Sequence, residues 1–153
     1  MSEQVDIDYD SITSLNLSHR KLKVIPDLSM YKNLVKLDVS FNKLKSLDNL
    51  PSSILELDCS HNLIESLDNL PHGLLNLNCS FNKIKSLDNL PSSLEYLNCN
   101  NNKLTSLDNL PYGLKELNCN NNKLSSLDNL PSSILKLRFG GNKLTFKTIR
   151  LCI

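Results

Sequence analysis

The chain has few of the residues on which several common activities depend. It contains no tryptophan, only four glycines among 153 residues, and 5% aromatic residues. No glycine-rich loop of the kind that cradles phosphates is present, and Gly140-Gly141 is expected to form a turn. The three histidines, His19, His61 and His72, are not paired with a nucleophile in any local motif. We therefore expect no catalytic set and a protein that is not an enzyme.

Long apolar runs and an excess of charge are also missing. No apolar run approaches the ~20 residues of a membrane span, and the acidic N-terminus lacks the basic and apolar regions of a signal peptide. Lys and Arg number 17 against 16 Asp and Glu, and this net charge of +1 gives no long-range field that favours nucleic acid or an anionic membrane. We expect a cytoplasmic protein that is not secreted through a signal peptide and has no nucleic-acid or membrane partner.

A unit of 20 residues recurs through most of the sequence. Its clearest copy begins at Leu94 with LEYLNCNNNKLTSL, and its template is LxxLxLxxNxLxxL followed by D-N-L-P and two linking residues. Seven copies begin at Ile12, Leu34, Ile54, Leu74, Leu94, Leu114 and Ile134, and the first link is 22 residues long. The repeat divides the chain into an acidic N-terminal cap (1–11), a repeat array (12–145) and a last strand or cap (146–153).

The repeat predicts a stacked architecture. Its alternating apolar residues give a short strand that buries one face, and one turn cannot bury these residues alone, so successive turns must stack. Strands ~4.8 Å apart in seven turns make a parallel sheet of roughly 30 Å. Asp-Asn-Leu-Pro occurs five times on the return path, where proline disfavours helix. We expect a mostly β solenoid of the α/β class, with a concave parallel sheet and an extended, helix-poor convex side.

The repeat resembles that of leucine-rich repeat proteins. The 20-residue step and the L-P-x-x-L linker resemble bacterial type III effectors, and SLDNLPSSLEYLNCNNNKLT resembles repeat proteins of giant amoeba-infecting viruses of the mimivirus kind. The resemblance implies a module that binds a protein of a host cell and is located in the cytoplasm of that cell. Some effector relatives carry a ubiquitin-ligase domain after the repeats, so the targeting part of an enzyme is the alternative. The helical hairpin that precedes the repeats in such effectors is not evident here.

Four of the five cysteines follow the same step. They are Cys59, Cys79, Cys99 and Cys119. Each replaces an apolar residue that points into the core, and their parallel side chains do not converge as a tetrahedral metal site requires. We interpret them as reduced core residues and expect no metal and no cofactor.

Three polar columns also run along the array. The asparagines 42, 62, 82, 102, 122 and 142 are interpreted as structural, because a buried amide must satisfy backbone groups. The aspartates 48, 68, 88, 108 and 128 suit turns whose carboxylates accept backbone N–H groups; the alternative is a Ca²⁺ site in which like charges raise each other's pKa. The lysines 21, 43, 83, 103, 123 and 143, interrupted by Leu63, form either a solvated rim or a docking edge for acidic partners.

The positions that the repeat leaves free on the sheet are the candidate binding residues. Aromatic and aliphatic side chains occupy them in the first half of the array, and aromatic anchors are typical of protein interfaces. The predicted protein-binding residues are Asp38, Phe41, Leu55, Asp58, His61, Leu75, Phe81, Tyr96, Asn98 and Arg138. The alternative is that the aromatic residues only cover the loop. A third hypothesis is a structural role through self-association, in which an apolar end strand with Ile149, Leu151 and Ile153 pairs with another copy. The expected state is a monomer or a weak dimer that forms through this strand.

Overall fold

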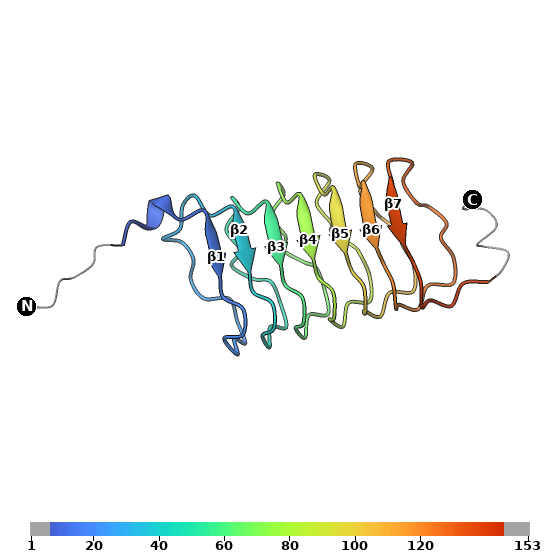
Figure 1. The fold of residues 1–153 in the computed structure, drawn as a ribbon, viewed down its shortest axis with the longest axis horizontal. Helices are drawn as coiled ribbons and strands as arrows, with labels where there is room; N and C mark the ends of the chain where they lie inside the picture. The colour runs from blue at the N-terminus through green and yellow to red at the C-terminus, as the bar shows by residue number, and fades with distance from the viewer. Residues whose placement is uncertain (1–6, 146–153) are drawn as a thin grey trace, which may run out of the picture.

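The computed structural model describes residues 7–145, which form one parallel sheet of seven short strands (Figure 1). The strands lie side by side in chain order, so no strand crosses over another. They are β1 (Ser14–Asn16), β2 (Lys36–Asp38), β3 (Glu56–Asp58), β4 (Asn76–Asn78), β5 (Tyr96–Asn98), β6 (Glu116–Asn118) and β7 (Lys136–Arg138). The predicted solenoid with a parallel sheet is confirmed.

The fixed period sets the register of the sheet. The central leucine of each strand pairs with that of the next, as in Leu37 with Leu57, because the two positions are separated by one whole turn. In β2 to β6 this leucine is at most 3% exposed, and its two neighbours on the strand face solvent. Each three-residue strand therefore contributes one side chain to the core and two to the open face of the sheet.

The cysteine column lies within this core. Cys59, Cys79, Cys99 and Cys119 are each 0% exposed and carry free thiols. The thiols of Cys79, Cys99 and Cys119 donate to a carbonyl oxygen of the following turn, for example Cys99 Sγ to Asn118 O at 3.4 Å. Burial raises the pKa of all four thiols above the ordinary value of 9.0, that of Cys119 to about 12. The interpretation of these residues as core is confirmed.

The asparagine ladder connects neighbouring turns through hydrogen bonds. The Nδ2 group of Asn62 donates to Val39 O of the preceding turn at 3.0 Å and to Cys59 O and Ser60 O of its own turn at 3.1 Å. Its Oδ1 accepts from Leu44 N at 2.9 Å. The same pattern recurs down the column, so these amides are structural, as predicted.

The return side contains no α-helix or strand within residues 7–145, as predicted. The aspartates there do act as turn residues, but their hydrogen-bond partners differ from the expected backbone N–H groups. From the second Asp-Asn-Leu-Pro segment onward, the asparagine donates to the aspartate one turn earlier, as in Asn89 Nδ2 to Asp68 Oδ1 at 3.1 Å. Hydrogen bonds from Ser66 and Asn89 lower the pKa of Asp68, so the raised pKa of the Ca²⁺ alternative is wrong at this residue.

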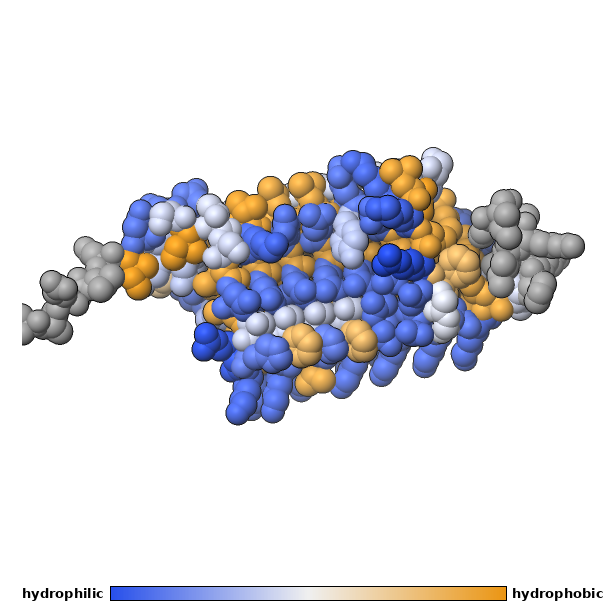
Figure 2. All heavy atoms as spheres, viewed as in Figure 1, coloured by the Kyte–Doolittle hydropathy of each residue, from blue (hydrophilic) through white to orange (hydrophobic). Residues whose placement is uncertain are grey.

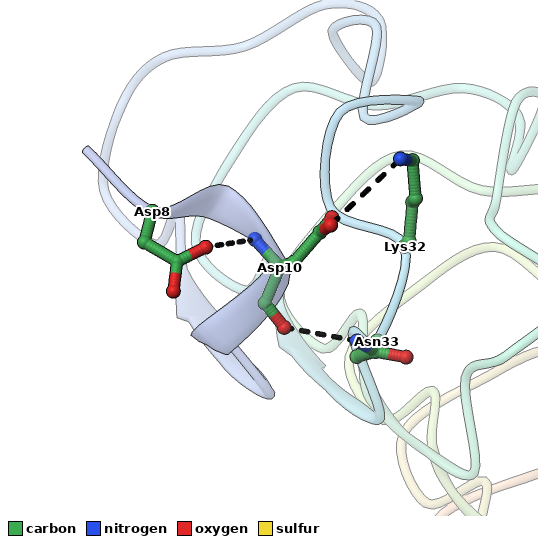
Figure 3. A network of polar contacts seen from close by, with 4 residues as sticks. All are labelled: Asp8, Asp10, Lys32 and Asn33. Atoms are coloured by element: carbon green, nitrogen blue, oxygen red, sulfur yellow. Dashed lines mark hydrogen bonds and ion pairs between the residues drawn. The ribbon is translucent and has the colours of Figure 1, made fainter. Parts of the chain in front are cut away.

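The described N-terminal part packs on the first turn through the 3-10 helix η1 (Tyr9–Ser11). Asn33 Nδ2 donates to Asp10 O at 2.9 Å and Lys32 pairs with the Asp10 carboxylate at 3.8 Å (Figure 3). The rings of Tyr9 and Tyr31 meet edge to face at 5.4 Å. Because η1 has three residues, the described segment holds no helix able to span a membrane. The predicted strand and end-to-end pairing surface in 146–153 lie outside the described residues.

Candidate functional site

The open face of the sheet carries charges that neutralise one another across strands. Lys36 of β2 pairs with Glu56 of β3 at 3.0 Å, and Lys136 of β7 pairs with Glu116 of β6 at 2.6 Å. A third pair joins Lys115 to Glu95 at 2.8 Å, just before β6 and β5. All of these groups are substantially exposed, so each pair is worth little energetically. Their effect is to leave the lysines of this face without excess charge.

The residue that ends each of the strands β1 to β6 holds the chain as it leaves the sheet. Oδ1 of Asp38 accepts from Ser40 N at 2.9 Å, and Oδ1 of Asp58 accepts from the N–H and the hydroxyl of Ser60 at 2.9 and 2.6 Å. Asn98 accepts from Asn100 N at 3.3 Å. Asp38, Asp58 and Asn98 were predicted as binding residues, and sequence reasoning missed this second role. The signal was an Asp or Asn two residues before a Ser or Asn, typical of an Asx turn.

Two shallow hollows lie on the open face. One, of ≈ 230 Å³, extends over β2 to β5 and is lined on one side by Asp38 and Asp58. The other, of ≈ 420 Å³, lies between Asn76 and Glu116. Tyr96 of β5 borders both. Neither is enclosed, and in residues 7–145 no group of three or more His, Cys, Asp or Glu side chains could hold a metal ion. The face suits a macromolecular surface better than a small ligand.

A ladder of aromatic rings follows the strand exits of the first four turns. The rings of His19, Phe41, His61 and Phe81 stack in that order, with centroids 4.4, 4.1 and 4.2 Å apart and planes within 11° of parallel. Phe41 and Phe81 remain 46% and 45% exposed. Because the ring faces contact one another, the ladder presents ring edges to solvent. Sequence reasoning placed these residues in one column but did not predict the stack.

The two phenylalanines of the ladder adopt a backbone conformation that is unfavourable for them. Phe41, His61 and Phe81 have φ values of 54°, 52° and 54°, in the left-handed region. This region costs most L-residues about 1–2 kcal/mol, whereas asparagine and glycine tolerate it. The last three turns place Asn101, Asn121 and Gly141 at the same position. The turn therefore needs only asparagine or glycine, and its geometry does not explain the aromatic rings.

The lysine column lies beside the ladder, two residues further along each turn. We call the ladder (His19, Phe41, His61 and Phe81) together with this column (Lys21, Lys43, Leu63, Lys83, Lys103, Lys123 and Lys143) the strand-exit border. None of the ion pairs found in residues 7–145 involves a lysine of this column. Figure 2 shows the border as a hydrophilic fringe with apolar groups set into it, at the edge toward which the strands point. It is a cationic edge with an aromatic part.

All of the predicted site residues except Arg138 fall into neighbouring columns of the second to fifth turns. Asp38, Phe41, Asp58, His61 and Phe81 belong to the second, third and fourth turns. Leu55 and Leu75 precede β3 and β4 on the entry side of the strands, and Leu75 is 36% exposed. Tyr96 and Asn98 follow on β5, whereas Arg138 lies on β7, two strands further along the sheet. Arg138 is therefore separated from the aromatic ladder.

Comparisons with known proteins agree with this architecture. Residues 92–132 match the family model of leucine-rich repeats (2 copies). The fold is similar to YopM, a leucine-rich effector protein from Yersinia pestis, with 36% identity, a TM-score of 0.79 and coverage of 86% of this chain and 37% of that chain. A Shigella effector leucine-rich repeat domain is 27% identical, with a TM-score of 0.64 and coverage of 92% and 74%.

A further similar structure concerns the fold alone. The functional domain of InlJ from Listeria monocytogenes, which includes a cysteine ladder, is 24% identical, with a TM-score of 0.52 and coverage of 86% of this chain and 44% of that chain. No curated protein matches the chain. The chain spans 37% of the length of the Yersinia pestis YopM chain and 30% of that of YopM from Yersinia enterocolitica, or about a third of each.

The repeat, the single parallel sheet and its helix-poor return side define a leucine-rich repeat solenoid. The chain is a leucine-rich repeat protein whose array resembles those of bacterial effectors. This fold is typically a non-enzymatic scaffold for protein interactions, because stacked repeats present an extended and rigid binding surface.

Proposed function

We propose that this protein is a non-enzymatic module that binds a partner protein through the open face of its sheet and the strand-exit border of the first four turns. The observation that carries the proposal is the ladder of Phe41, His61 and Phe81, whose two phenylalanines are exposed and adopt a left-handed conformation. Backbone strain that the fold does not require is found at functional sites. Exposed aromatic rings on a rigid surface are the usual anchors of protein interfaces.

The charges on the sheet favour the same region. Asp38 and Asp58 border the hollow over β2 to β5, and each uses Oδ1 in its turn while Oδ2 accepts only an asparagine side chain, from Asn16 and Asn78. A carboxylate oxygen with one donor retains capacity for another. The similarity to effector proteins supports a partner from a host cell and a cytoplasmic location there.

An affinity capture with matched variants tests the proposal. The bait is the full chain, and the test variant carries Phe41→Asn and Phe81→Asn, the residue that Asn101 and Asn121 already place in this conformation. The control is Tyr112→Ser, which removes a 94% exposed aromatic residue from the return side. Cell extracts are compared by quantitative mass spectrometry.

We expect at least one protein that the wild type and the Tyr112 variant retain equally and the ladder variant loses. Direct binding of that protein, purified, should weaken at least about tenfold for the ladder variant, as for an anchor worth more than 1.4 kcal/mol. If every captured protein binds the ladder variant as well as the wild type, the ladder is not the binding site.

A further inference from the structure

We infer that the strand-exit border binds an extended acidic segment of the partner protein, with an apolar side chain seated on the aromatic ladder between carboxylates held by Lys43 and Lys83. This inference rests on the proposed function and adds to it the chemistry of the partner. Its basis is the distribution of charge. The lysines of the open sheet face, Lys36 and Lys136, have glutamate partners, whereas the column at the border has none among the described ion pairs.

The unpaired lysines create a local excess that the net charge of the whole chain conceals. Adjacent turns place successive column positions about 5 Å apart, within the Debye length of ~8 Å at physiological salt. Their fields therefore add along the border and attract a run of negative charge. A lone carboxylate would gain little at such an exposed site, whereas a series of carboxylates gains from every lysine that it passes.

The lysine column is interrupted in the third turn, where the ring of the ladder has another aromatic ring on each side. Leu63, half-buried, replaces lysine between Lys43 and Lys83. Beside it, His61 is stacked between Phe41 and Phe81. The border thus has an apolar centre with a cation on each side. Because the two lysines are two turns apart, their positions are separated by about 10 Å along the array. This is complementary to an apolar residue flanked by acidic residues.

The dimensions fit a short stretch of extended chain. The four rings span roughly 13 Å from the first centroid to the last, the length of about four residues of a β-strand. The ring edges that face solvent carry the positive side of the aromatic quadrupole, so they favour the backbone carbonyl oxygens beside the apolar side chain. An extended peptide supplies such oxygens along its whole length.

The same stack argues against nucleic acid as the occupant. Proteins that bind single strands stack bases on exposed aromatic faces. Here the ring centroids of Phe41 and His61 are 4.1 Å apart, so the two rings stack directly on each other. A base cannot enter the ladder without breaking it, so the observations favour a peptide.

Fluorescence anisotropy with three labelled probes tests the inference on the full chain. The first probe is a peptide of about 12 residues that repeats Asp-Leu-Asp-Ser, the second repeats Lys-Leu-Lys-Ser, and the third is an oligo(dT) of similar length. The variants are Lys43→Gln with Lys83→Gln, and the ladder pair Phe41→Asn with Phe81→Asn. The control is Lys103→Gln with Lys123→Gln, the same column beside Asn101 and Asn121, where the ladder has ended.

We expect the acidic peptide to bind at least about tenfold more tightly than the basic one, and more weakly as salt rises. The Lys43 and Lys83 substitutions and the ladder substitutions should each weaken it at least about fivefold, and the control less than about twofold. Equal binding of the two peptides, or equal losses in test and control variants, would overturn the inference. Tighter binding of oligo(dT) that depends on the ladder would assign the border to nucleic acid instead.

The outcomes separate this inference from the proposed function. If the peptides show no acidic preference but the ladder variant still loses its captured protein, the chain binds protein through the ladder and the partner's chemistry is not acidic. If the acidic peptide binds and no captured protein depends on the ladder, the border recognises acidic chains but the proposed use of the ladder in partner capture is wrong. Circular dichroism of each variant establishes that it is folded.

Discussion

Replacement of Asn102 tests the account of the asparagine ladder most directly. Its side chain is 8% exposed. Nδ2 donates to Cys79 O at 3.0 Å, to Cys99 O at 3.1 Å and to Asn100 O at 3.3 Å, while Oδ1 accepts from Ile84 N at 2.9 Å. Asn102→Ala removes all four hydrogen bonds at once.

The four backbone groups are not affected equally. Cys79 O and Cys99 O retain the amides of Asn82 and Asn122, and Asn100 O retains Phe81 N. The N–H of Ile84 has no other described acceptor. One orphaned buried donor costs about 1–3 kcal/mol, and three bonds to carbonyls that keep a partner cost about 0.5 kcal/mol each. The total loss in the free energy of unfolding is therefore about 2.5–4.5 kcal/mol.

Asn102→Asp tests the donated hydrogen bonds separately from the accepted one, because it removes the Nδ2 donor and keeps an acceptor oxygen. The new carboxylate still accepts from Ile84 N, but its second oxygen faces three carbonyl oxygens and its charge is buried. We expect it to be more destabilising than alanine at pH 7. The folded state raises the pKa of this carboxyl, so the stability that the residue retains is present below the unfolded value of ~3.9 and is lost as pH rises.

Urea unfolding followed by circular dichroism measures both variants against the wild type, at pH 7 and near pH 4. The difference between Asn102→Asp and the wild type should shrink at the lower pH, while that of Asn102→Ala should stay constant. A cost below about 1 kcal/mol for alanine, or a milder effect of aspartate than of alanine at pH 7, would refute the assignment of the three donated hydrogen bonds.

Three further predictions concern other columns of the array. The buried thiols of Cys79 and Cys99 should resist Ellman's reagent in the native state at pH 8 and react on unfolding. Because the pKa values of these thiols are raised, their contribution to stability is complete below about pH 9 and falls as pH rises. Urea titrations should show a loss of up to about 1.4 kcal/mol per pH unit for each thiol. Labelling of the native protein as fast as the unfolded protein would contradict the burial of the thiols. Phe81→Asn should change the free energy of unfolding by less than about 1 kcal/mol, because relief of the left-handed strain offsets the lost stacking. Phe81→Val loses the stacking but keeps the strain, so it should destabilise the protein by about 1–2 kcal/mol more than Phe81→Asn does. The pKa of Asp68, lowered first by Ser66, should rise in Ser66→Ala by NMR titration; its stabilising contribution is present above the unfolded pKa and is lost as pH falls through the folded one.

Much of the candidate site was predictable as a set of columns. A period of one turn places Phe41, His61 and Phe81 in line, and any side chain at that position must lie at the strand exit. The contacts between columns were not predictable in the same way. That Asn89 would reach Asp68 depends on the left-handed backbone of the asparagine, with φ of 64°, which turns its side chain toward the preceding turn.

The sequence by itself determined the architecture. Leucine spacing, the cysteine and asparagine columns and the five Asp-Asn-Leu-Pro segments predict stacked turns with a parallel sheet, because one turn cannot bury its apolar residues alone. Only the tertiary structure decided how the free positions behave. Lysines on the sheet face meet glutamates on adjacent strands, whereas lysines at the strand-exit border do not. The rings stack because the left-handed turns aim them along the array at 4.1–4.4 Å. Spacing gives the position of a side chain, but backbone conformation and the neighbouring turn give its direction and its partner.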